Sequence, residues 1–155
     1  MQTSDGVFYI VKRAQYHETD SMKIVHHANY VKWMEEARLE FFRHAGFDWA
    51  YMEKEFGIMI PVLFQSVEYR KAIRFDEEVE VRCVCDKFNG VKMNYSYEFV
   101  SADHTLLAAG ITRHGFVNAE FEPVMLQNTY TEGYTALSNA VKNQKIKDSG
   151  KREQG

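Results

Sequence analysis

The most regular pattern in the chain lies in EVEVRCVCDKFNGVKMNYSYEFV, residues 78–100. Apolar and polar residues alternate on both sides of Asn89-Gly90. Alternation with period two is typical of a strand with one buried face, and Asn-Gly is a favoured two-residue hairpin turn. The stretch therefore predicts two antiparallel strands, Glu78–Phe88 and Val91–Val100, joined by a tight turn at Asn89-Gly90.

Three further stretches are strand-like, with weaker alternation than the hairpin. They lie at about residues 7–16, 62–73 and 106–117, and a polar loop at 101–105 separates the last of them from the hairpin. Strands that follow one another through short connections usually lie side by side in a sheet. The chain therefore predicts an antiparallel sheet of about five strands.

One long helical pattern lies between the first strand and the others. Its apolar residues recur at three- and four-residue spacing, which is typical of an amphipathic helix. They are Tyr30, Trp33, Met34, Ala37, Phe41 and Ala45. Asn29 is the expected N-cap, and Gly46 stands where a C-terminal glycine is expected. A shorter helix is predicted at 48–56, ended by Gly57.

Charged residues mark the remaining face of the long helix. Glu35 with Arg38, and Glu40 with Arg43, are spaced to form pairs there. A helix packed against an antiparallel sheet is an α+β architecture. A single helix cannot cover both faces of such a sheet, so we expect a second copy of the chain to cover the rest, by two-fold symmetry.

The length of 155 residues predicts one domain at 1–137, followed by a polar, Lys-rich tail at 138–155 that we expect to be partly disordered. A net charge of -3 argues against a nucleic-acid partner. No apolar run is long enough to span a bilayer, and the N-terminus does not resemble a signal peptide. Cys83 and Cys85 are expected to be reduced core residues. These features suggest a cytoplasmic protein without membrane insertion.

The unusual stretch is YHETDSMKIVHHANY, residues 16–30, which joins the first strand to the long helix. It holds a carboxylate, two adjacent histidines and the start of a helix. A helix N-terminus offers free backbone N–H donors and the positive end of the helix dipole. Such a terminus suits the oxyanion that forms in acyl transfer.

Here the residues carry a resemblance. The pattern T-D-x-x-x-x-V-x-H-x-N-Y, followed by E-x-A-R, resembles the signature of the 4-hydroxybenzoyl-CoA thioesterase family. The matching residues are Thr19, Asp20, Val25, His27, Asn29, Tyr30, Glu36, Ala37, Arg38 and Gly46. Phe75-Asp76-Glu77 and the strand residues Ala109, Gly110, Thr112 and His114 resemble later elements of the family. The resemblance spans about residues 7–125.

The resemblance implies a hot-dog fold, with the sheet wrapped around one central helix, and hydrolysis of acyl-CoA to the free acid and CoA. It implies that Asp20 either attacks the thioester carbonyl or activates a water, and both roles stay open. The family's oxyanion donor, a backbone N–H at the turn into the helix, maps onto His27. We therefore expect Asp20 and His27 to be catalytic, and Asn29, Tyr30 and Lys23 to contact the substrate.

The resemblance also implies partners. The substrate is an acyl-CoA, no cofactor is required beyond the CoA of the substrate, and no metal is expected. The chain is expected to form a homo-oligomer, either a dimer or a dimer of dimers, hence a homotetramer. Basic side chains that could contact the phosphates of CoA, none of them assigned individually, are Arg70, Lys71, Arg74, Lys87 and Lys92.

Two departures and three alternatives accompany this interpretation. Many relatives have glycine at the position of Lys23 and proline at that of Ala72, which leaves the identity of the substrate open. Hydrolysis of acyl chains on acyl carrier protein is one alternative, and non-catalytic binding of an acyl ligand is another. A metal held by His17, Asp20 and the adjacent histidines is disfavoured, because neighbouring side chains diverge on an extended chain.

Overall fold

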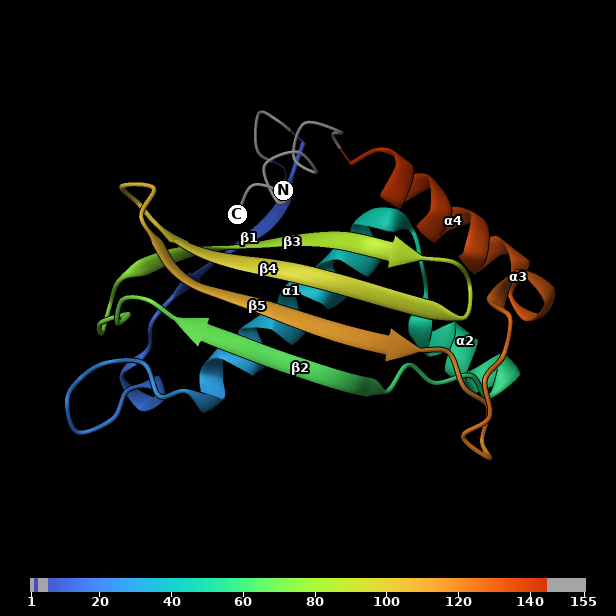
Figure 1. Ribbon diagram of the computed structural model, residues 1–155, viewed down its shortest axis with the longest axis horizontal. Helices are drawn as coiled ribbons and strands as arrows, with labels where there is room; N and C mark the ends of the chain where they lie inside the picture. The colour runs from blue at the N-terminus through green and yellow to red at the C-terminus, as the bar shows by residue number, and fades with distance from the viewer. Residues whose placement is uncertain (1, 3–5, 145–155) are drawn as a thin grey trace.

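A computed structural model describes residue 2 and residues 6–144. Five antiparallel strands form one sheet in the order β1-β3-β4-β5-β2 (Figure 1). The strands are β1 (Phe8–Arg13), β2 (Val62–Tyr69), β3 (Glu78–Phe88), β4 (Lys92–Ser101) and β5 (Leu106–Gly115). All five predicted strands are confirmed, although β1 and β2 end earlier than the sequence suggested.

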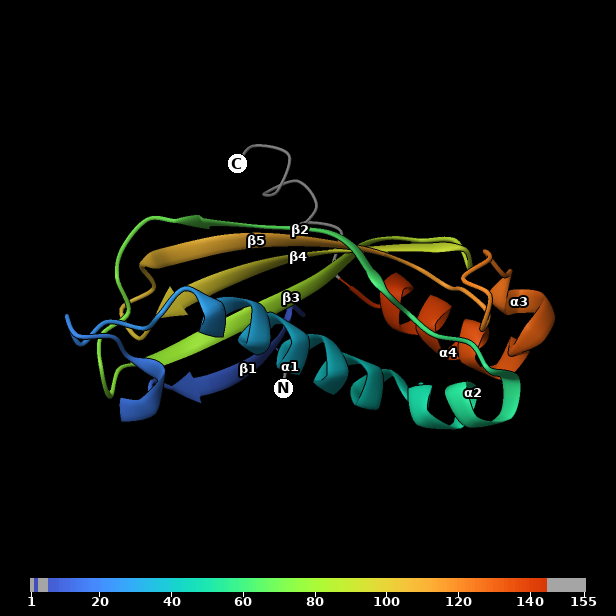
Figure 2. The same ribbon diagram turned by 90° about the horizontal axis from the view of Figure 1, so that it is seen from below.

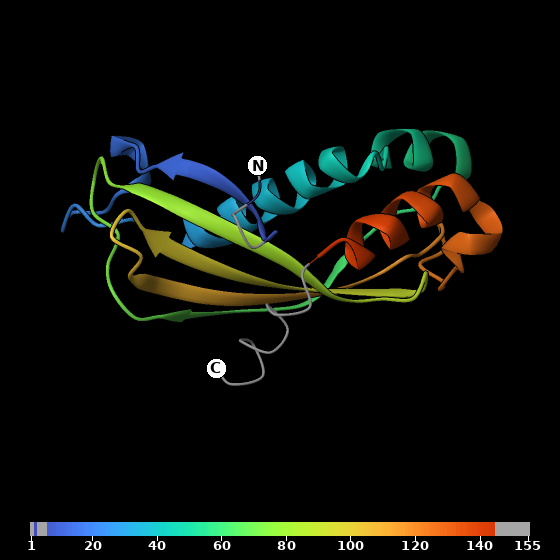
Figure 3. The same ribbon diagram turned by 90° about the horizontal axis from the view of Figure 1, so that it is seen from above.

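The helices lie on one face of the sheet, as the two side views show (Figures 2 and 3). They are η1 (Tyr16–Glu18), α1 (Ala28–Ala45), α2 (Trp49–Phe56), α3 (Leu126–Thr129) and α4 (Thr131–Lys142). The long helix α1 lies across the strands, which confirms the expected α+β arrangement of a five-stranded sheet around a central helix. No helix in the described part of the chain covers the other face of the sheet.

The core forms where α1 meets the sheet. The predicted apolar face of α1 is buried, with Met34 and Ala37 fully inaccessible to solvent. Arg38 is also buried, and its Nη1 donates to the hydroxyl of Tyr97 at 3.0 Å. The predicted surface pair of Arg38 with Glu35 is therefore wrong, because position 38 falls on the face that α1 turns toward β4. The pair of Glu40 with Arg43 is present on the exposed face.

The turn between β3 and β4 differs by one residue from the prediction. The N–H of Asn89 donates to the carbonyl of Lys92 at 3.2 Å, so the two loop residues are Gly90 and Val91. The side chain of Asn89 accepts from the N–H groups of Val91 at 3.0 Å and Lys92 at 2.8 Å. Asparagine thus closes the turn through its side chain, while Gly90 takes the left-handed conformation with φ 86°.

The C-terminal boundary predicted after residue 137 falls inside α4. Leu137 is fully buried, and the Gln144 side chain bonds both backbone groups of Cys85, at 2.8 and 2.9 Å. Residues 138–144 therefore continue the folded unit, because the apolar face of α4 packs on the core despite its polar composition. The remainder of the predicted tail, 145–155, lies outside the described residues.

Two smaller observations concern the cysteines and the membrane. Cys83 and Cys85 are buried thiols that are not joined in a disulfide. None of the helices in the described ranges is both long and apolar enough to cross a bilayer.

A close approach of α1 to the sheet, at Gly110, generates a first prediction. A Cβ at Gly110 of β5 would lie 2.4 Å from Sδ of Met34 and 3.3 Å from the carbonyl oxygen of Ser66. Since Met34 is fully buried, it has little room to move. We expect Gly110→Ala to lower the free energy of unfolding by about 1–3 kcal/mol, measured by urea denaturation.

The double variant Gly110→Ala with Met34→Val serves as the control, because a shorter side chain makes room for the new methyl group. We expect the free energy of unfolding to fall less in the double variant than the sum of its decreases in the two single variants. Strict additivity would contradict a steric contact between the two positions.

Candidate active site

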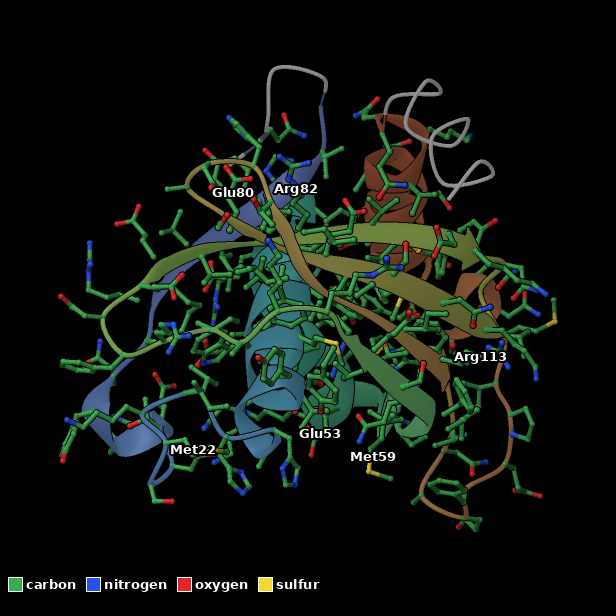
Figure 4. The ribbon with its side chains drawn as sticks, turned by 60° about the vertical axis from the view of Figure 1, so that its left-hand side comes forward. Met22, Glu53, Met59, Glu80, Arg82 and Arg113 are labelled. Atoms are coloured by element: carbon green, nitrogen blue, oxygen red, sulfur yellow. The ribbon has the colours of Figure 1, made fainter. Side chains whose placement is uncertain are left out.

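The loop before α1 holds Asp20 in a tight turn. The carbonyl of Asp20 accepts from the N–H of Lys23 at 2.9 Å, and its side-chain Oδ1 accepts from the N–H of Met22 at 2.8 Å. Aspartate is favoured at the first position of such turns because its carboxylate bonds the backbone two residues on. The carboxylate is therefore oriented by its own turn, with Met22 at the outer part of the loop (Figure 4).

Lys23 closes this turn in the left-handed conformation, with φ 62°. Glycine adopts that conformation without the steric cost that a side chain brings. The geometry gives a physical reason for the glycine that the family resemblance implies at this position. The ammonium group of Lys23 is not required for the turn, whose bonds involve the backbone of this residue.

The same loop is fastened to the segment that follows β2. The N–H of Val25 donates to the carbonyl of Ile73 at 2.7 Å, and the N–H of Phe75 donates to the carbonyl of Lys23 at 3.1 Å. These bonds lie on either side of an isolated bridge between Ile24 and Arg74. They bring the segment after β2 against the loop that carries Asp20.

Glu18 ties the loop to α1. Its Oε2 accepts from the indole N–H of Trp33 at 2.9 Å. Its backbone carbonyl accepts from the N–H of His26 and from the side-chain amide of Asn29, both at 2.8 Å. Sequence reasoning missed Glu18, because its partners are 8, 11 and 15 residues away along the chain.

The start of α1 differs from the prediction. His27, not Asn29, is the N-cap, and the ring Nδ1 of His26 accepts from the N–H of Ala28 at 3.1 Å. The two histidine rings stack with centroids 4.0 Å apart. The expectation that these side chains diverge is wrong, because His27 has helical backbone angles (φ -55°, ψ -29°) instead of extended ones.

One N–H at this helix start is not used. The N–H of His26 donates to the carbonyl of Glu18, and the N–H of Ala28 donates to the ring of His26. The N–H of Asn29 donates to the carbonyl of His26 at 3.0 Å, and the N–H of Tyr30 donates to the carbonyl of His27 at 3.3 Å. The N–H of His27 has no acceptor in the part of the chain that the structure describes. It is therefore available to an external acceptor.

A pocket of about 310 Å³ lies at this place. Its lining residues are Asp20, Ile24, Val25, His27, Tyr30, Tyr69, Arg70, Lys71 and Ala72. The rings of Tyr30 and Tyr69 meet edge to face at 4.9 Å and form an aromatic wall. Burial, followed by the neighbouring Tyr69, raises the pKa of Tyr30, so its hydroxyl stays protonated at neutral pH.

Three of the five predicted site residues meet in this pocket: Asp20, His27 and Tyr30. Asn29 is not among the lining residues, because its amide is engaged by the carbonyl of Glu18. Lys23 is exposed on the same loop, outside the lining.

Two of the unassigned cations, Arg70 and Lys71, do line the pocket. Together with the carboxylate, the free N–H and the aromatic wall, they suit a ligand that has a polar reacting group, an apolar part and negative charge. Within residues 6–144, no three histidine, cysteine or acidic side chains are gathered as a metal site would require.

A second polar cluster lies inside the core. The Tyr97 hydroxyl, which accepts from Arg38, also bonds Oγ1 of Thr112 at 2.8 Å, and Nε2 of His114 bonds the same Oγ1 at 2.8 Å. All four side chains are buried. Burial, and then the charge of Arg38, lower the pKa of His114 from its usual 6.5 to about 3. His114 is thus a neutral structural residue, although it belongs to the motif that carried the resemblance.

Several known proteins are similar to this chain. A family model described as the thioesterase-like superfamily matches residues 14–128. The chain is 33% identical over 129 residues to "Putative acyl-CoA thioesterase YneP" of Bacillus subtilis, covering 83% of this chain and 93% of that protein. It is 32% identical over 95 residues to the acyl-CoA thioester hydrolase YbgC of Escherichia coli O157:H7, covering 61% and 70%.

A solved structure is similar over most of its length. The DHNA-CoA thioesterase from Staphylococcus aureus superposes with a TM-score of 0.80 at 32% sequence identity, covering 86% of this chain and 89% of that one. The range that the family model matches, residues 14–128, includes the loop before α1 and all the residues that line the pocket.

The buried histidine generates a second prediction. Between pH 6.5 and pH 3 the unfolded chain takes up a proton at His114 and the folded chain does not. The free energy of unfolding should therefore decrease as the pH falls through this window, with a contribution of at most about 1.4 kcal/mol per pH unit. Urea denaturation at several pH values in this window measures the slope.

The variant His114→Gln, which cannot be protonated, should show a shallower decrease. His17→Gln is the matched control, because His17 is exposed. Equal slopes for the wild type and His114→Gln would contradict a neutral, buried imidazole at this position.

Proposed function

The chain belongs to the thioesterase-like superfamily, and we propose from this premise that it hydrolyses acyl-CoA thioesters to the free acid and CoA. Asp20 and the N–H of His27 are the proposed reacting groups. One observation carries the proposal: the carboxylate residue and the residue with the unused N–H line the same pocket.

The proposed chemistry follows from this pair. The thioester oxygen accepts a hydrogen bond from the N–H of His27, which stabilises the negative charge that develops on it. Asp20 either attacks the carbonyl carbon or removes a proton from an attacking water. In both cases the carbon–sulfur bond breaks, CoA leaves as a thiolate that takes up a proton, and one water is consumed overall.

The long helix supports the same role for the His27 N–H. This residue caps α1, which has 18 residues. Partial positive charge gathers at the N-terminus of a helix, and its effect falls off within the first turn. A developing oxyanion at the His27 N–H would therefore gain from the helix as well as from the direct hydrogen bond.

The substrate contacts follow from the lining. We assign the wall of Tyr30 and Tyr69 to the acyl group, and Arg70 and Lys71 to its CoA phosphates, since guanidinium and ammonium groups bind phosphate well. Lys23, exposed on the loop, would contact an anionic group that extends out of the pocket. Asn29 would act indirectly, by holding the loop through Glu18.

Such a reaction needs no cofactor beyond the CoA of the substrate, and it fits the cytoplasm, where CoA esters are used. Acyl carrier protein carries its acyl chains on the same pantetheine arm, so it is the second candidate donor. The cations at the pocket would suit its acidic surface. A non-catalytic acyl binder is the remaining alternative, in which Asp20 only closes the turn.

We also propose that the protein is a homo-oligomer, either a dimer or a dimer of dimers. The edge strand β2 is exposed along nearly its whole length and carries large apolar side chains. These are Val62, Leu63, Phe64 and Tyr69, with Met59 and Ile111 beside them. Met59 and Arg113 lie toward the beginning of this strand (Figure 4). An edge with this composition is typical of an interface, since an exposed apolar edge strand otherwise aggregates.

A third prediction tests the catalytic role of Asp20. Asp20→Asn keeps a side-chain oxygen that can accept from the N–H of Met22, so the turn is retained, but it removes the negative charge. We expect kcat to fall by about 100-fold or more, because a general base or nucleophile is lost. Thiol release over a panel of acyl-CoA and acyl carrier protein substrates measures it.

Binding of the acyl-CoA substrates should persist in Asp20→Asn, as measured by calorimetry. If the wild type binds acyl-CoA but hydrolyses none of the substrates, the non-catalytic alternative is correct. Higher kcat/KM on acyl carrier protein than on CoA would identify the second candidate donor.

A fourth prediction concerns assembly. Sedimentation at micromolar concentration should give at least twice the chain mass of 18.1 kDa. Leu63→Lys should shift the protein toward monomer, because a charge in an apolar interface is costly. Val11→Lys, at an exposed position of the other edge strand, is the matched control. A monomeric wild type would contradict the proposal.

A further inference from the structure

We infer that His26 is a positioning residue: its backbone and its ring together aim the N–H of His27 at the substrate and leave it as the single free donor at the start of α1. The inference rests on the proposed function. It assigns a role to a histidine that lies outside the pocket lining.

The first step concerns the peptide unit that joins His26 to His27. The carbonyl of this unit accepts from the N–H of Asn29 at 3.0 Å, so it points along α1. A trans peptide is planar, and its carbonyl and N–H point in opposite directions. The N–H of His27 must therefore point away from the helix, and the bond to Asn29 sets its direction.

The second step concerns the position of His26 in the loop. Its own N–H donates to the carbonyl of Glu18 at 2.8 Å, and Glu18 is held in turn by Trp33 of α1 at 2.9 Å. The backbone of His26 is therefore bonded on both sides, through its N–H to the loop and through its carbonyl to the helix. The two bonds hold the two successive peptide units on either side of His26, and the His26–His27 unit cannot rotate without breaking the bond between its carbonyl and Asn29.

The third step concerns the imidazole. Its Nδ1 accepts from the N–H of Ala28 at 3.1 Å, and an accepting Nδ1 requires the proton of a neutral ring to be on Nε2. Without this acceptor, the N–H groups of both His27 and Ala28 would be open at the helix start. Water or substrate could then bind the wrong donor, so the ring of His26 leaves one donor for the reaction.

The fourth step concerns the contact between the two rings. The imidazoles of His26 and His27 stack with centroids 4.0 Å apart and planes inclined by 30°. Both histidines are exposed, and of the two only His27 lines the pocket with Asp20. The ring contact therefore links the ring that accepts from Ala28 to a residue of the pocket.

Two variants separate the acceptor from the stack. His26→Asn keeps an oxygen that can accept from the N–H two residues on, and it loses the ring. His26→Phe keeps a ring that can stack on His27 and loses the acceptor. Comparing them shows whether the hydrogen bond to Ala28 matters for turnover, and circular dichroism verifies that both variants are folded.

We expect His26→Phe to lower kcat for acyl-CoA by about tenfold or more with KM changed less than about twofold, because an oxyanion donor acts mainly in the transition state. His26→Asn should stay within about threefold of the wild-type kcat, since an asparagine oxygen can replace the acceptor. A purely structural role would lower stability without this separation of kcat from KM.

A second measurement needs no variant and no turnover. Nitrogen-15 NMR of the imidazoles in the wild-type protein should show that the neutral ring of His26 carries its proton on Nε2 and leaves Nδ1 as an acceptor. A neutral ring with its proton on Nδ1 would overturn the inference, whatever the kinetic result.

The outcomes also separate this inference from the proposed function. If the wild type hydrolyses acyl-CoA and folded His26→Phe has an unchanged kcat, the inference fails and the proposed function stands. If the wild type hydrolyses no thioester of the panel, the proposed function fails, and the positioning role of His26 fails with it.

Discussion

The hydrogen bonds of Glu18 hold the pocket together. Its carboxylate accepts from the indole N–H of Trp33, and its carbonyl accepts from His26 and Asn29. The indole belongs to a fully buried residue of α1, so the loop is anchored to the core instead of to a surface side chain. This anchor holds the N–H of His26 and the side chain of Asn29, and so it fixes where the loop enters α1.

Most of the bonds that position the site are therefore hydrogen bonds with a backbone group. The carboxylate of Asp20 is oriented by the N–H of Met22, and the loop is fastened by backbone bonds to Ile73 and Phe75. Side chains such as those of Met22 and Lys23 stay exposed and can change without loss of these bonds. An arrangement of this kind keeps Asp20 and the N–H of His27 in place while the outer side chains can change.

The sheet contributes in two ways. Inside, the polar chain from Arg38 through Tyr97 and Thr112 to His114 links α1 to β4 and β5, and Gly110 lets the helix approach closely. Outside, β2 leaves an apolar edge uncovered, and the cations Arg70 and Lys71 follow directly after it. The exposed edge and the pocket are thus continuous along the chain, so pairing at β2 would lie next to the pocket.

Local patterns predicted much of this protein. Alternation and helical spacing located all five strands and the two helices α1 and α2, because each pattern follows from burial on one side of an element. The motif around Asp20 and His27 identified two residues that do line one pocket. Patterns failed where an element was short or its apolar face was diluted by polar residues, as in η1 and α4.

The remaining features depend on contacts between distant segments, which no local pattern reports. The burial of Arg38 follows from which face of α1 meets β4. The contact between the His26 and His27 rings follows from a backbone that is helical at His27 instead of extended. The place of Arg70 and Lys71 beside Asp20 follows from the bonds between residues 23–25 and 73–75. The sequence determines which functional groups the side chains carry. Hydrogen bonds that form only when the chain has folded determine where these groups point.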